Sequence, residues 1–189
     1  MKLYYDTGVF LWFLENKDNT ERLNRVKETY QLGVLHNHRC ISLYTTLEAL
    51  HLILIGKIYP DKQFDKIWKE IETLRGAFRT LEFDSNILNS QINALIYALT
   101  INQKIDIKIY KKIKKLNSLD WAHLVMAEIG ECEEFLTNDS GFLFLDSIKQ
   151  HLKFEKLKRI VIFKSSTSFR KFLNQNDLEI DKIIELKSS

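Results

Sequence analysis

Short apolar runs alternate with longer amphipathic segments along most of the chain. The short runs are rich in β-branched and aromatic residues and predict strands at residues 2–6, 40–44, 134–138 and 159–163. The longer segments have helical periodicity and predict helices at residues 8–16, 45–59, 61–76, 84–102 and 108–130. Because strands followed by helices form parallel sheets through helical crossovers, the pattern predicts an α/β fold with helices on both faces.

Composition agrees with a single soluble domain followed by a short C-terminal extension. The chain has 189 residues, of which 45% are hydrophobic and 28% charged, and its net charge is +3. Cys40 and Cys132 form no CxxC pair, which favours reduced thiols and a cytoplasmic protein. Asp6 interrupts the first apolar run, and the run at 92–101 is about half the length that spans a bilayer. We therefore expect no signal peptide and no membrane segment.

Four acidic residues lie where the predicted strands end or where helices begin. Asp6 and Asp139 follow the first and third predicted strands, Glu48 lies early in the helix after the second, and Asp120 opens a largely apolar helix. In an open parallel sheet, ligands bind beyond the carboxyl ends of the strands. We therefore expect these carboxylates to meet at one edge of the sheet.

Each acid taken alone also has an ordinary structural explanation. Asp6 suits a tight turn in Asp-Thr-Gly, and Asp139 suits one in Asn-Asp-Ser-Gly. Glu48 fits a capping box with Thr45, and Asp120 is favoured by the helix dipole in a first turn. These alternatives stay open for the single residues, so the metal hypothesis depends on their convergence.

Converging carboxylates repel one another unless a cation neutralises them. Oxygen ligands favour hard ions, so the sequence predicts a Mg²⁺ or Mn²⁺ site. One or two such ions would activate a water molecule and stabilise the charge on a phosphodiester.

The four acidic segments resemble those of the PIN-domain family in order and rough spacing, over residues 1 to about 165. The matching segments are YYDTGVFLWFL, SLYTTLEALHL, LDWAHLVMAEIG and FLTNDSGF. The resemblance implies a three-layer α/β/α sandwich with a mainly parallel central sheet in residues 1–165, and residues 166–189 would be an extension. It also implies a Mg²⁺- or Mn²⁺-dependent endoribonuclease in which Asp6, Glu48, Asp120 and Asp139 are both catalytic residues and metal ligands.

The family resemblance carries expectations about products and partners as well. Hydrolysis of RNA would leave a 5′-phosphate and a 3′-hydroxyl. Many members are VapC-like toxins of toxin–antitoxin pairs, which implies a small antitoxin protein and a homodimer as partners. Gly8 stands where the family commonly carries Asn or Ser, and the chain is longer than the usual toxin.

A basic segment at residues 104–118 precedes Asp120 and contains six lysines and one aspartate. A solvated helix face explains it, but such a patch would also track an RNA backbone without reading its sequence. The RNA-binding candidates are Lys111, Lys112, Lys114 and Lys115. His123 lies three residues after Asp120, and we expect a half-buried structural histidine rather than a ligand.

Three other functions are weighed against the nuclease. An aspartic protease carries its Asp-Thr-Gly on a loop between strands, whereas the triplet that begins at Asp6 leads into a predicted helix. An aspartyl-phosphate phosphotransferase needs an acid two residues after its nucleophile, where Gly8 stands. A non-catalytic PIN-like module that binds RNA or a protein is the main alternative.

Overall fold

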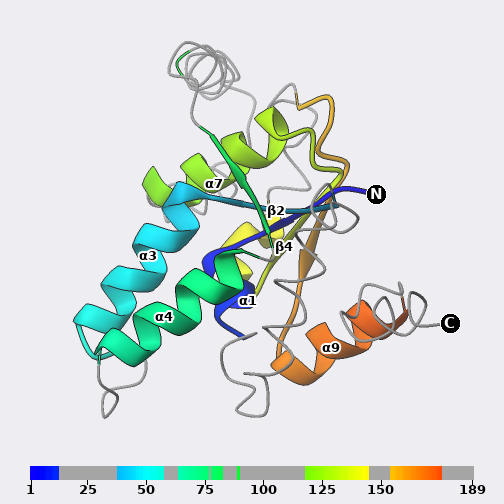
Figure 1. Ribbon diagram of the computed structural model, residues 1–189. Helices are drawn as coiled ribbons and strands as arrows, with labels where there is room; N and C mark the ends of the chain where they lie inside the picture. Colours follow the sequence, from blue (N-terminus) through cyan, green and yellow to red (C-terminus); the bar gives the residue numbers. More distant parts are fainter. Residues whose placement is uncertain are drawn as a thin grey trace, which may run out of the picture.

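A parallel sheet forms the centre of the protein (Figure 1). The computed structural model describes residues 1–12, 38–57, 64–76, 78–82, 89, 118–144 and 154–175. The strands are β1 (Leu3–Tyr5), β2 (Arg39–Ser42), β3 (Arg79–Leu81), β4 (Glu134–Thr137) and β5 (Arg159–Ile162). Their order is β3-β2-β1-β4-β5, and every neighbouring pair is parallel.

Helices cover both faces of this sheet. They are α1 (Thr7–Leu11), α3 (Leu43–Leu54), α4 (Phe64–Arg75), α7 (Ser118–Ile129) and α9 (Ser166–Gln175), with a 3₁₀ helix η2 (Ser140–Phe144). Tyr5 and Ile41 pack with apolar residues of α1, α3, α4 and α9 on one face. Tyr4, Cys40 and Phe135 pack with α7 and η2 on the other. Alternate residues of each strand therefore pack into hydrophobic cores on opposite faces of the sheet. The arrangement is consistent with a three-layer α/β/α sandwich.

The predicted parallel α/β fold and its four strands are confirmed, each strand within one or two residues of its expected bounds. The sequence analysis missed β3, because three residues, Arg79–Leu81, are too few to show a strand pattern. The predicted helix at 84–102 lies outside the described residues, apart from residue 89. Within the expected extension, α9 packs Phe169 and Leu173 into the core.

Glu128 ties α7 to the segment that leads into β5. Its buried carboxylate accepts hydrogen bonds from the backbone N–H groups of Glu155, Lys156 and Leu157 at 2.8–3.1 Å. These bonds satisfy a turn of backbone that forms no sheet or helix bonds of its own. Within the described residues, no helix has the length and apolar character to cross a membrane.

Candidate metal centre

Asp6 lies at the carboxyl end of β1, where it caps the start of α1. Its side chain is buried, with 8% of the residue exposed. One carboxylate oxygen accepts the backbone N–H of Thr7 at 2.8 Å, and the other accepts the Thr137 hydroxyl at 2.6 Å. Because the bond to Thr137 crosses from β1 to β4, the sheet itself fixes the orientation of this carboxylate.

Glu48 reaches the same place from the second turn of α3. Its Oε2 accepts the Thr7 hydroxyl at 2.5 Å and lies 3.2 Å from His123 Nε2. The expected capping box between Thr45 and Glu48 is wrong. α3 begins earlier, at Leu43, and the backbone N–H of Ser42 donates to Thr45 Oγ1 at 3.4 Å instead. The Glu48 carboxylate is thus available to the edge of the sheet.

His123 completes the cluster from α7, on the opposite face of the sheet from α3. Only 1% of the residue is exposed. Its Nδ1 lies 2.7 Å from the Tyr4 hydroxyl, which donates its proton to Ser42 Oγ at 2.7 Å. The Tyr4 oxygen therefore accepts the Nδ1–H, and Nε2 faces Glu48 at 3.2 Å and Asp6 at 3.8 Å.

One ligand atom each from Asp6, Glu48 and His123 lies within 4.8 Å of the other two. Adjacent ligands about 2.1 Å from an octahedral ion lie roughly 3 Å apart, and those at wider angles lie up to about 4 Å apart. The 3.2 Å and 3.8 Å separations fall in this range. Two carboxylates and one imidazole could therefore hold a divalent ion between them.

The pKa values of the two carboxylates are shifted in opposite directions. Burial raises the pKa of Asp6, and the nearby charge of Glu48 raises it further, although His123, Thr137 and Thr7 oppose these effects. The pKa of Glu48 is lowered, mainly by a hydrogen bond from a protonated His123 Nε2 and also by that from Thr7. A bound ion would take the place of the Nε2 proton. Asp6 is thus the member of the cluster whose negative charge most needs a cation nearby.

The structure places the other two predicted acids outside this three-residue group. Asp120 is half-buried in the first turn of α7, one turn before His123. Asp139 is exposed after β4, and its Oδ1 accepts the backbone N–H of Gly141 at 2.6 Å. It is linked to Asp6 indirectly, because its N–H donates to the Thr137 hydroxyl at 3.0 Å.

Gly8 allows a close approach at the start of α1. A Cβ atom at this position would overlap the side chain of Asn138, which follows β4. A side chain at this position would require the Asn138 side chain to move. The RNA-binding candidates Lys111, Lys112, Lys114 and Lys115 lie outside the described residues.

His123 is the site residue that sequence reasoning set aside. One signal was present, since it is the only ionisable residue between Trp121 and Ala127 on a helix of low polarity. His123 lies close to Asp6 because of the way α7 packs on the sheet, and the periodicity of the sequence does not show this packing. No protein-family model, no curated protein and no solved structure matches this chain.

Proposed function

We propose that this protein is a metal-dependent endoribonuclease of the PIN-domain type, and that Asp6, Glu48 and His123 hold its divalent ion. The observation that carries the proposal is the convergence of their ligand atoms within 4.8 Å, from β1, α3 and α7. The position also supports it, because the carboxyl edge of a parallel sheet is where substrates bind in such folds. Asp120 and Asp139 are further acids that the family resemblance assigns to the site.

The donor set fits a divalent ion and bears on which one. Two carboxylate oxygens suit Mg²⁺ and Mn²⁺ alike, whereas an imidazole nitrogen suits transition metals better than Mg²⁺. The hydrogen bond from His123 Nδ1 to Tyr4 is the outer-sphere support that metal-binding histidines usually have. We therefore propose Mn²⁺ as the preferred ion, with Mg²⁺ binding more weakly.

When bound, such an ion supplies an activated water nucleophile and neutralises charge on the phosphodiester. The chain's own part is to hold three side chains in one arrangement. Thr7 contributes twice, because its N–H holds Asp6 and its hydroxyl holds Glu48. Thr137 orients the second oxygen of Asp6, and Tyr4 sets the tautomer of His123. Attack by water would leave a 5′-phosphate and a 3′-hydroxyl on the RNA fragments.

A cleavage assay on structured and unstructured RNA tests this function. Cleavage should need Mn²⁺ or Mg²⁺, stop with EDTA, and fall by at least about 100-fold in Asp6→Asn, since the change removes both a ligand and its charge. Asp65→Asn is the matched control, because Asp65 is exposed on α4. Fragments with 2′,3′-cyclic phosphate ends would contradict the proposal, since they require attack by the ribose.

RNA binding that is indifferent to the ion and to Asp6→Asn, without cleavage, would instead identify a non-catalytic binding module. On the family resemblance alone, we also propose a small antitoxin partner and a homodimer. Co-purification with the product of an adjacent short reading frame, followed by loss of cleavage in the complex, would test the antitoxin.

A further inference from the structure

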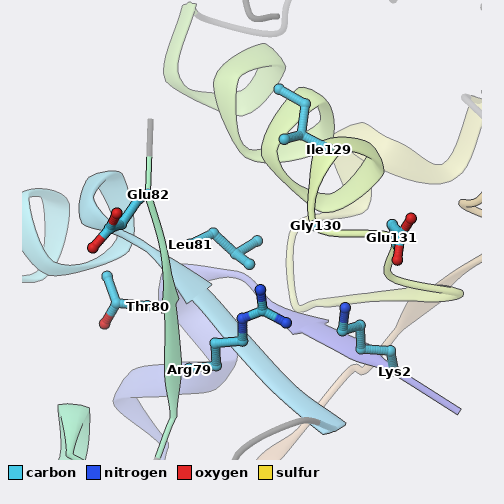
Figure 2. A pocket seen from close by; sticks show the side chains of 8 residues that line it. All are labelled: Lys2, Arg79, Thr80, Leu81, Glu82, Ile129, Gly130 and Glu131. Atoms are coloured by element: carbon cyan, nitrogen blue, oxygen red, sulfur yellow. The ribbon is translucent and has the colours of Figure 1, made fainter. Parts of the chain in front are cut away.

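A cavity of about 470 Å³ lies along β3, on the face of the sheet that α7 covers (Figure 2). It is bounded by Lys2 before β1, by the whole of β3 and by the end of α7. Its lining includes Lys2, Arg79, Leu81 and Gly130, with Glu82 and Glu131 at its margins. Its volume falls in the range of small-molecule sites, about 300–1,000 Å³.

The register of the sheet explains why two cations share this cavity. Tyr4 pairs with Cys40, and Cys40 pairs with Arg79, so these three side chains project on one face. Lys2 precedes Tyr4 by two residues and projects on that face as well. Its carbonyl accepts the N–H groups of Glu133 and Glu134 at 2.8 and 3.3 Å, which holds the backbone of Lys2 against β4.

Lys2 and Arg79 extend toward each other into the cavity (Figure 2). Both are half-buried, and within the described residues no carboxylate lies within 4.0 Å of either cationic group. Glu82 and Glu131, the acids nearest in the lining, form no ion pair with them. Two half-buried like charges that face one another favour an anion between them.

Both positive charges also act on a buried thiol, Cys40, which pairs with Arg79 in the sheet. The pKa of Cys40 is lowered, mainly by its hydrogen bond with Cys132 and, against the opposing effect of burial, by the positive charges of Lys2 and Arg79. Both cations affect the pKa of Cys132 in the same direction, although burial and Cys40 raise it overall. The two cations therefore lie close to the same pair of side chains.

The end of α7 forms the roof of the cavity in a strained conformation. Glu131 has φ of 56°, the left-handed region in which a side chain is unfavourable. Its N–H bonds to Glu128 O and that of Cys132 bonds to Ala127 O, both at 2.9 Å, so the last carbonyls of α7 are satisfied internally. Gly130 lets this turn approach β3, since a Cβ there would overlap Leu81.

We propose that this cavity binds a dianionic phosphate monoester between Lys2 and Arg79. A guanidinium presents two parallel N–H donors to phosphate oxygens, and an ammonium adds a point charge from the other side. A dianion satisfies both cations, whereas a monocarboxylate would leave one uncompensated. The remaining volume accommodates the group that carries the phosphate. The site is separate from the metal centre and does not depend on the proposed nuclease activity.

Calorimetric titration with inorganic phosphate tests the site, in EDTA and at constant ionic strength. We expect saturable one-to-one binding that Lys2→Gln and Arg79→Gln each weaken by at least about tenfold, as the loss of a charged hydrogen bond requires. Lys57→Gln, a change at an exposed lysine after α3, should leave binding unchanged. Absence of saturable binding, or equal affinity in all three variants, overturns the proposal.

Two further measurements identify the source of the phosphate and protect the test against a variant that fails to fold. Competition by a nucleoside 5′-monophosphate indicates a small ligand, and competition only by a 5′-phosphorylated oligoribonucleotide indicates the end of an RNA. Failure of both to compete overturns the assignment to a monoester. In the wild-type protein, phosphate should shift the NMR signals of Arg79 Nε–H and the Gly130 amide. Shifts confined to other residues count against the cavity.

Discussion

Substituting asparagine for Asp6 should make the metal-free protein more stable than wild type and the metal-loaded protein less stable. The Asp6 carboxylate is buried, and burial raises its pKa against the opposing effects of His123 and Thr137. The ionised form is therefore unfavourable in the folded chain without an ion. Asparagine has nearly the same shape and carries no charge.

The expected magnitudes follow from the contacts of the carboxylate. The side-chain oxygen of asparagine can still accept the Thr7 N–H, which lies 2.8 Å from Asp6 Oδ1 in the wild-type protein. Its hydrogen bond with Thr137 would be neutral instead of charged, which costs about 1 kcal/mol. It avoids burying a charge, which costs several kcal/mol, so unfolding free energy should rise by on the order of 1–2 kcal/mol. Ion at 100 times its dissociation constant stabilises wild type by about 2.7 kcal/mol, and it should stabilise the variant little.

Thermal unfolding in EDTA and in Mn²⁺ measures both effects. For a chain of this size, 1 kcal/mol shifts Tm by roughly 2–4 °C. The variant should therefore melt about 2–8 °C above wild type in EDTA, and Mn²⁺ should raise wild type by roughly 5–11 °C and reverse the order. Asp65→Asn should behave as wild type in both. Equal stabilisation of wild type and Asp6→Asn by Mn²⁺ would falsify the assignment of Asp6 as a ligand.

Four other perturbations follow from the structure. Tyr4→Phe removes the partner of His123 Nδ1 and should weaken Mn²⁺ binding by about 10–100-fold in calorimetry, whereas unchanged affinity would exclude this support. Glu128→Ala leaves three backbone N–H groups without their acceptor and should lower unfolding free energy in urea by at least about 2 kcal/mol. Glu131→Gly removes the strain of a side chain on left-handed backbone and should raise the unfolding free energy by about 1 kcal/mol. A decrease would show that the Glu131 side chain contributes more stability than the strain costs. The pKa of Glu48 is lowered from 4.5 by His123 and Thr7, so its stabilisation is complete above that pH and is lost as pH falls through the folded-state pKa. The stability difference between wild type and Glu48→Gln should therefore shrink toward zero in acid, and a difference independent of pH would contradict the shift.

The fold class was readable because two-sided burial leaves a strong pattern. Strands covered on both faces are apolar almost throughout, and the intervening segments show helical spacing, so a parallel sheet follows. The sequence also placed Asp6 and Glu48 at the carboxyl edge, where the structure brings their carboxylates near one another. β3 was missed because its three residues are too few to show a strand pattern.

Local pattern decides which residues become strands and helices, because burial on a sheet face or a helix stripe imposes periods of 2.0 and 3.6 along the chain. Distances between side chains on different elements are set by packing, and no period encodes them. His123 comes close to Glu48 only because α7 and α3 meet over the same edge of the sheet, and Lys2 faces Arg79 only because of the register from β1 through β2 to β3. The sequence thus predicts at which end of a strand or helix a carboxylate lies, whereas the side chains around it depend on how the layers pack together.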